Sequence, residues 1–126
     1  MPPARWAARA LVAAVFIHGG WCTLTDPESR EQAAAPLLAR VRARLPALPS
    51  DQALVRTNAA VHVGAGLFLA AGIAPRAAAR ILALSLVPTT VAGHPARDDA
   101  DLIQIVKNAG ILGGLILAAP ESAARP

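Results

Sequence analysis

The chain has 126 residues, of which 55% are apolar and 16% are charged, and it carries a formal net charge of +4. This length allows a single domain over residues 1–126, and the charged fraction is below the roughly 25% typical of soluble domains. The basic residues are scattered and the aromatic residues are two Phe, two Trp and no Tyr, which excludes a base-stacking surface and hence a nucleic-acid partner. Because Cys22 is the only cysteine, an intrachain disulfide and a CxxC redox pair are also excluded.

Four apolar stretches indicate the environment of the protein. They cover residues 7–24, 53–73, 77–92 and 102–119, and each is close to the ~20 residues that a helix needs to cross a hydrocarbon core about 30 Å thick. Their clustering predicts an all-α fold, a four-transmembrane-helix bundle in contact with the lipid bilayer. A soluble four-helix bundle is the alternative, but residues 109–119 are apolar all round, whereas an exposed bundle helix would show a polar face.

The first stretch imitates a secretory signal, because Arg5 and Arg9 precede the apolar run 10–17. No small-x-small cleavage site follows that run. We therefore expect an uncleaved first helix, which ends at the turn signal Asp26-Pro27.

Residues 28–50 form the longest connection between the apolar stretches. Leu38, Val41, Leu45 and Leu48 recur there at helical spacing, and the arginines between them fall largely on other faces of the wheel. This pattern fits a short interfacial helix between the first two spans, with its arginines among lipid headgroups. A lid packed over the bundle fits the pattern equally well.

Local signals bound the second and third helices. Ser50 or Asp51 can cap the second helix, and the connection 74–76 is so short that the second and third helices must be antiparallel neighbours. Inside the third helix, the ring of Pro88 removes the backbone hydrogen bond to Leu84. The hydroxyls of the two threonines that follow can satisfy the freed backbone groups.

Basic residues near the spans predict the orientation. Arg5, Arg9, Arg76 and Arg80 lie close to the ends of spans, whereas the arginines at residues 30–44 lie in a longer loop. The positive-inside rule counts the basic residues close to the spans. We therefore expect both termini in the cytoplasm.

Polar side chains inside the apolar stretches are candidate functional residues, because such groups are costly in lipid unless they face the bundle interior. Asn58 and His62, four residues apart, share one face of the second helix, and His62 lies about 14 Å past the helix start, near the bilayer midplane. Arg56 lies one turn from that start, and the fourth helix carries Lys107 and Asn108. No Asp or Glu lies inside any span. Arg56 and Lys107 must therefore donate to other acceptors, namely amides, hydroxyls, a neutral imidazole, freed backbone carbonyls or an anionic ligand.

Small residues predict which helices pack together. Gly110 and Gly114 lie on the same face of the fourth helix as Lys107, and Ala60 with Gly64 offers a counterpart on the second helix. Such small-x-x-x-small pairs allow two helices to approach closely. We therefore expect the second and fourth helices to pack against each other.

Three interpretations of the polar cluster remain open. The residues could lock the bundle through interhelical hydrogen bonds worth about 0.6 kcal/mol each on average, bind a small anion or a quinone-type carbonyl, or form a partner interface. A histidine in the loop before Pro95 is expected to be accessible to a ligand, and no metal site is expected because the three histidines lack motif spacing. The candidate ligand-binding residues are Arg56, Asn58, His62, Thr89, Thr90, His94, Lys107 and Asn108.

Five strings resemble the DoxX family of small bacterial membrane proteins. They are LVRTNAA at 54–60, GAGL at 64–67, APR at 74–76, SLVPTTVAGH at 85–94 and VKNAGILGGL at 106–115. The resemblance implies a four-helix bundle in the bacterial cell (inner/plasma) membrane. The family is named for a subunit linked to thiosulfate:quinone oxidation, and some members are associated with membrane complexes that handle thiol or oxidative stress.

The resemblance implies a membrane subunit of a redox complex that handles sulfur compounds or thiols and is linked to quinone. In that role Arg56, His62, His94 and Lys107 would position a quinone or a sulfur oxyanion. We expect no intrinsic cofactor, so the chain is at most a partner-dependent subunit of an oxidoreductase, and the partner supplies the flavin, metal or dithiol. A non-enzymatic scaffold or small-solute carrier is the alternative, and the expected partners are a redox enzyme or further copies of the chain.

Overall fold

The computed structural model of this chain describes residues 3–93 and 98–119, and the regular elements in those ranges are all helices. Their order is α1 (Pro3–Thr25), α2 (Glu28–Arg42), α3 (Asp51–Ala71), α4 (Pro75–Gly93) and α5 (Asp99–Ala118). The four longer helices α1, α3, α4 and α5 correspond to the four apolar stretches. The predicted all-α class is therefore confirmed.

The helix ends follow local capping chemistry. Ser50 caps α3, since its Oγ accepts a hydrogen bond from the N–H of Ala53 at 3.2 Å. Gly72 ends the same helix in the left-handed conformation, with φ of 70°. Asp98 caps α5 by accepting from the N–H of Asp101 at 2.8 Å. These ends lie close to the boundaries that the sequence predicts.

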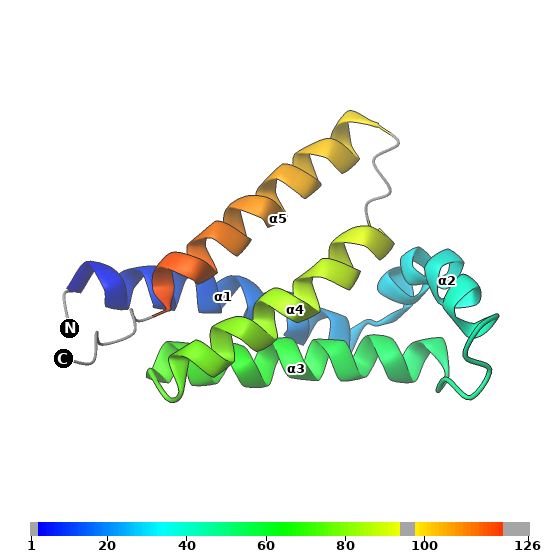
Figure 1. The fold of residues 1–126 in the computed structure, drawn as a ribbon, viewed down its shortest axis with the longest axis horizontal. Helices are drawn as coiled ribbons and strands as arrows, with labels where there is room; N and C mark the ends of the chain where they lie inside the picture. The colour runs from blue at the N-terminus through cyan, green and yellow to red at the C-terminus, as the bar shows by residue number, and fades with distance from the viewer. Residues whose placement is uncertain (1–2, 94–97, 120–126) are drawn as a thin grey trace.

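The longer helices form a bundle in which α1 packs against α3 and α5, and α4 packs against the same two helices. As expected, α3 and α4 are antiparallel neighbours joined by a tight turn, and the start of α1 lies at the same end of the bundle as the end of α5 (Figure 1). Helices α3 and α5 are not among the packed pairs. The prediction that the second and fourth apolar helices pack together is therefore wrong.

The close helix contact lies between α1 and α3 instead. A Cβ built on Gly20 would lie 2.7 Å from the carbonyl oxygen of Ala59, and one built on Gly66 would lie 2.8 Å from Cγ1 of Ile17. By contrast, Gly64 and Gly110 have no neighbouring element within 4 Å of such a Cβ. A small-residue motif permits close approach without selecting the partner helix, which is why the sequence pattern indicated the wrong pair.

Buried apolar side chains gather in the half of the bundle that contains the α3–α4 turn. Leu69 of α3, Leu82 of α4 and Leu115 of α5 are fully buried there, and α1 adds Ala13 and Phe16 to the same cluster. The half of the bundle nearer to α2 is less completely filled. It is this half that contains the cavity.

Helices α1, α3 and α5 are long and apolar enough to cross a membrane. Their outer faces carry large apolar side chains, of which Leu117 is 79% exposed, and extended apolar surface of this kind marks contact with lipid or another apolar partner. Helix α4 also exposes Leu84 but is not one of the three, and Arg76 and Arg80 lie within it. A fourth span through α4 stays a prediction.

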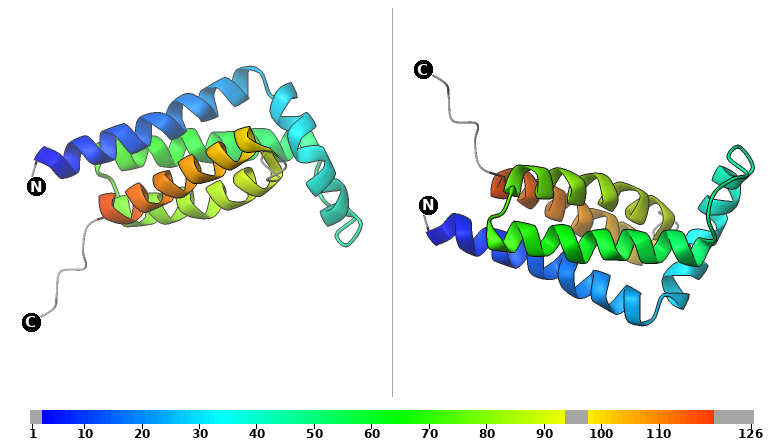
Figure 2. Two further views of the ribbon diagram at one scale, coloured as in Figure 1. Left: turned by 90° about the horizontal axis from the view of Figure 1, so that it is seen from above. Right: turned by 90° about the horizontal axis from the view of Figure 1, so that it is seen from below.

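Helix α2 crosses the end of the bundle and packs against α3 and α4 (Figure 2). Its end is fixed by Arg42, whose Nη2 donates to the carboxylate of Asp51 at 2.7 Å and to the carbonyl of Pro49 at 2.8 Å. The helix ends at Arg42, so the expected helical face does not continue through Leu45 and Leu48. Of the two predicted roles, α2 takes the position of a lid over the bundle, and its contact with the membrane interface stays a prediction.

Arg9 is buried at the opposite end of the bundle, with 6% of its surface exposed. Its Nε donates to the carbonyl oxygen of Ala118 at 3.2 Å, and its Nη1 would lie 3.2 Å from a Cβ built on Gly72. The carbonyl groups at helix C-termini carry partial negative charge, so this one guanidinium links α1 to the ends of α3 and α5. The sequence presented Arg9 only as a basic flank of the first span.

Candidate functional site

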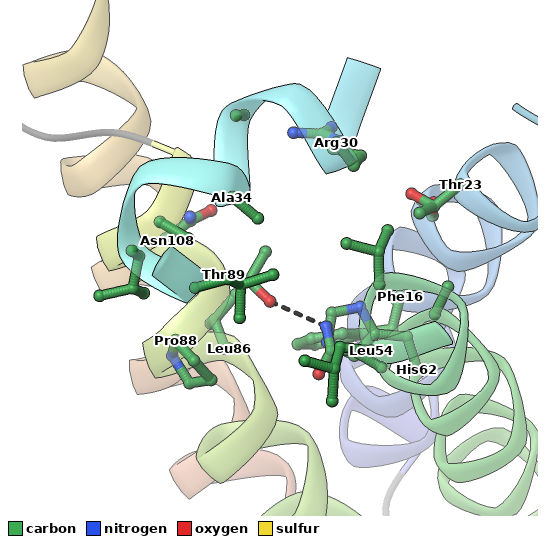
Figure 3. A pocket seen from close by; sticks show the side chains of 18 of the residues that line it. Phe16, Thr23, Arg30, Ala34, Leu54, His62, Leu86, Pro88, Thr89 and Asn108 are labelled. Carbon is green, nitrogen blue, oxygen red and sulfur yellow. Dashed lines mark hydrogen bonds between the residues drawn. The ribbon is translucent and has the colours of Figure 1, made fainter. Parts of the chain in front are cut away.

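A cavity of about 500 Å³ lies between the bundle and α2. All five helices contribute to its wall, and most of the wall is apolar (Figure 3). The polar residues that line it are Thr23 from α1, Arg30 from α2, Asn58 and His62 from α3, Thr89 from α4, and Gln104, Lys107 and Asn108 from α5. The fold therefore collects polar groups from distant parts of the chain around one hollow.

Two side-chain hydrogen bonds cross from neighbouring helices to α4. Asn58 of α3 donates from Nδ2 to Oγ1 of Thr89 at 2.9 Å, and Asn108 of α5 donates in the same way to Thr90 at 2.9 Å. Each of these adjacent threonines of α4 thus accepts one hydrogen bond from a side-chain amide, Thr89 from α3 and Thr90 from α5. Helix α4 bridges α3 and α5, which do not pack against each other.

The same threonines are tied to the backbone of α4 beside Pro88. Thr89 donates to the carbonyl of Ser85 at 2.9 Å, and Thr90 donates to the carbonyl of Leu86 at 2.8 Å. Pro88 lies inside the helix rather than ending it, which agrees with hydroxyl groups supporting a proline-containing helix in an apolar setting. The sequence indicated the carbonyl of Leu84 as the acceptor, because Pro88 cannot donate to it. The hydroxyls bond instead to the carbonyls of the next two residues.

His62 is the buried titratable group of the cavity wall, with 9% of its surface exposed. Its ring meets Phe16 of α1 edge to face, with centroids 5.1 Å apart and planes at 80°. Its Nε2 is buried and has no hydrogen-bond partner in the part of the chain that the structure describes. A buried polar atom without a partner costs free energy, so a ligand that bonds to Nε2 would remove that cost.

Two cationic side chains, Arg30 and Lys107, reach the cavity from α2 and α5. Within residues 3–93 and 98–119, neither forms an ion pair, and no Asp or Glu lines the cavity. An uncompensated positive charge beside apolar walls favours a ligand with acceptor oxygen atoms. The sequence predicted this charge pattern but placed the second cation at Arg56.

The structure collects most of the predicted candidate residues and leaves others out. Asn58, His62, Thr89, Lys107 and Asn108 line the cavity, and Thr90 holds Asn108 from behind. Arg56 is exposed and does not line the cavity, because it precedes Asn58 by two residues, about 200° around a helix of 3.6 residues per turn. His94 lies outside the described residues.

Arg30, Gln104 and Thr23 are lining residues that the sequence interpretation missed. Gln104 precedes Asn108 by one helical turn, so its place on the same face could have been predicted from spacing. Arg30 shares a helix face with Leu37 and Val41. The spacing of these residues predicts that shared face, but the sequence did not indicate which part of the bundle α2 would cover.

The remaining cysteine and histidine of the described residues, Cys22 and His18, do not line the cavity. Cys22 is an exposed free thiol whose Sγ lies 3.7 Å from Nε2 of His18, one turn earlier on α1. Among the described residues, no group of three His, Cys, Asp or Glu side chains could hold a metal ion.

A double-mutant cycle at Asn58 and Thr89 is expected to show that their hydrogen bond stabilises the bundle. Cross-helix bonds of this kind contribute about 0.6 kcal/mol on average, so Asn58→Ala and Thr89→Val should couple by roughly that amount in detergent unfolding titrations. The control pair is Asn58→Ala with Thr57→Val, since the hydroxyl of Thr57 donates to the carbonyl of Ala53 in its own helix. Equal coupling in the two cycles would contradict the assignment.

Comparison with known proteins identifies one similarity. The family model described as DoxX matches residues 4–95, which include all but the first residue of α1 and the whole of α2, α3 and α4. No curated protein and no solved structure matches the chain.

Proposed function

Because the chain belongs to the DoxX family, a family of membrane proteins, we propose that it is the membrane subunit of a quinone-linked redox complex that handles sulfur compounds or thiols. The cavity beneath α2 is the proposed ligand site. In this role the chain binds and orients a quinone head or a sulfur oxyanion, while a partner enzyme supplies the group that carries electrons. The chain has a single cysteine and cannot form a dithiol–disulfide couple within itself.

The observation that carries this proposal is the charge and shape of the cavity. Lys107 and Arg30 provide cationic donors without a matching carboxylate among the described lining residues, and the rest of the wall is largely apolar. A quinone carbonyl or a sulfur oxyanion accepts hydrogen bonds from such donors, and an apolar wall fits the ring of a quinone. His62 offers one more nitrogen for a hydrogen bond.

The proposed placement is the plasma membrane of a bacterium, with four spans, α2 at the interface and both termini in the cytoplasm. The start of α1 and the end of α5 lie at one end of the bundle (Figure 1), together with Arg5, Arg9, Arg76 and Arg80. Basic residues close to spans favour the cytoplasmic side. These features support the proposed orientation.

A second candidate function is a non-enzymatic scaffold or a small-solute carrier. The hydrogen bonds of Asn58 to Thr89 and of Asn108 to Thr90 favour it, since they hold the bundle together without any ligand. In this case the polar cluster serves packing first, and further copies of the chain are the expected partner.

Purification of the tagged chain from native membranes in mild detergent tests the proposal. We expect a stoichiometric oxidoreductase by mass spectrometry, and quinone reduction by the complex. Lys107→Met should then weaken the apparent quinone affinity about tenfold, equivalent to about 1.4 kcal/mol and of the order of one charge-assisted hydrogen bond. Arg40→Met, which removes an exposed cation of α2 away from the cavity, is the matched control. Absence of a redox partner, or equal affinity in both variants, would count against this function.

A further inference from the structure

Helices α1 and α5 touch at one end and separate toward the other. At the closed end, Arg9 bonds to the carbonyl of Ala118, and a Cβ built on Gly114 would lie 3.2 Å from Cγ2 of Val12. Toward α2 the two helices diverge, as both Figure 1 and Figure 2 show. Gly19, in the diverging half of α1, has nothing within 4 Å of a Cβ built on it.

Residues from the diverging halves of both helices line the cavity. Gly19 and Thr23 of α1 line the cavity from one side, and Lys107 and Ile111 of α5 line it from the other. Gly19 is also exposed, so it lies at the rim. Helix α2 packs mainly against α3 and α4, and it therefore covers the end of the bundle rather than this side.

The direction of the opening restricts the ligand. Helices α1 and α5 are both apolar enough to cross a membrane, so a gap between them faces lipid rather than water. A molecule that uses this gap must be soluble in the membrane. The two cationic side chains of the wall, Lys107 and Arg30, donate hydrogen bonds and therefore favour acceptor oxygen atoms on its head. The unpartnered Nε2 of the buried His62 offers one further polar contact.

We propose that the gap between α1 and α5 is a lateral entrance from the bilayer, and that the ligand is a single-chain amphiphile whose head carries acceptor oxygen atoms. The head lies between Lys107 and His62, and the apolar chain leaves the cavity past Gly19 between the two helices. This inference deepens the ligand site of the proposed function and rests on it.

Photolabelling of the full chain in lipid nanodiscs tests the entrance. The probe is a C16 fatty acid with a diazirine near the chain end, and labelled peptides are mapped by mass spectrometry. We expect saturable labelling of residues 15–23 and 104–111, which unlabelled palmitate removes. Labelling spread evenly over all lipid-facing helices, without competition by palmitate, would overturn the proposal.

Two glycine variants test the route itself. Gly19→Phe should lose the site-specific labelling, because its ring fills the rim. Gly64→Phe should keep that labelling, because Gly64 also has free space around its Cβ but does not line the cavity. Circular dichroism of both variants checks that they fold, and the competition by palmitate on the unaltered chain stands independently of them. Undiminished labelling in Gly19→Phe would contradict the entrance.

His62→Phe tests the position of the head. The variant keeps an aromatic ring against Phe16 and removes Nε2, so half-saturation of labelling should need about ten times more probe, an effect of the order of one lost hydrogen bond. Unchanged half-saturation would place the head elsewhere and overturn this part of the proposal.

Competition by decylubiquinone separates this inference from the proposed function. If decylubiquinone displaces the fatty acid probe, the entrance admits quinone carbonyl heads and both proposals are supported. If only palmitate displaces it, the lateral entrance is supported with an anionic head, and the quinone-linked function is contradicted.

Discussion

Gly20→Ala is expected to lower the thermal unfolding midpoint of the detergent-solubilised protein strongly, although it adds a single methyl group. That methyl carbon would lie 2.7 Å from the carbonyl oxygen of Ala59, 2.9 Å from Cγ2 of Val63 and 3.1 Å from Cβ of His62. The first of these is backbone of α3 and cannot rotate away, so α1 and α3 must separate. Overpacking of this kind costs about 1–3 kcal/mol, and close contact of small residues is a main source of helix association in membranes.

The matched control for this substitution is the adjacent residue. Gly19→Ala adds the same methyl group on the same helix, but nothing lies within 4 Å of it. Alanine is favoured over glycine in a helix by up to about 1 kcal/mol, so this variant should unfold at the same temperature or higher. Circular dichroism melts of the two variants make the comparison, and equal midpoints would show that α1 and α3 do not cross at Gly20.

Arg9→Met is the second substitution for which we expect a large loss of stability. Methionine retains much of the side-chain volume but removes the charged donor that bonds to the carbonyl of Ala118 and lies beside Gly72. Hydrogen bonds that involve a charged group contribute about 1.5–3 kcal/mol, and the favourable interaction with two helix C-termini is lost as well. The loss should appear as a lower unfolding midpoint and as faster amide hydrogen exchange in the last turn of α5.

Two further variants make the Arg9 experiment decisive. Arg9→Lys keeps the charge without the planar guanidinium, so its stability should be intermediate. Arg80→Met removes an exposed arginine of α4 and should change stability little, since exposed charges contribute little. If Arg9→Met matched Arg80→Met, Arg9 would be a flank of the first span, as the sequence pattern alone indicated.

The candidate site was partly predictable because some of its geometry is local. Asn58 and His62 are four residues apart and must share a helix face, and both line the cavity. Thr89 and Thr90 follow a proline inside an apolar run, which predicts that their hydroxyls bond to the backbone near it. Both hydroxyls do so, but to the carbonyls of Ser85 and Leu86 and not to that of Leu84, which Pro88 leaves without its helix donor. Arg56 and Asn58 are two residues apart and therefore lie on different faces of the helix, but the sequence interpretation grouped both in one site.

Other parts of the site depend on contacts between segments far apart in the chain. Arg30 enters the cavity only because α2 folds back over the end of the bundle, and Arg9 is buried only because the ends of α3 and α5 meet α1. No local pattern distinguishes these two arginines from those that face solvent or headgroups. Their roles follow from the packing of whole helices.

Apolar runs, prolines and capping residues determined the number, order and approximate ends of the helices, because these signals act within one or two turns of chain. Family membership could be inferred from the sequence for the same reason, because the resemblance lies in short continuous stretches of residues. The short connection 74–76 determined that α3 and α4 are neighbours, but the remaining pairs were decided by tertiary structure: Gly20 and Gly66 are used between α1 and α3, whereas Gly64 and Gly110 are not. A helix face with glycines allows another helix to approach closely. Which helix does so depends on the combined contacts of all five helices.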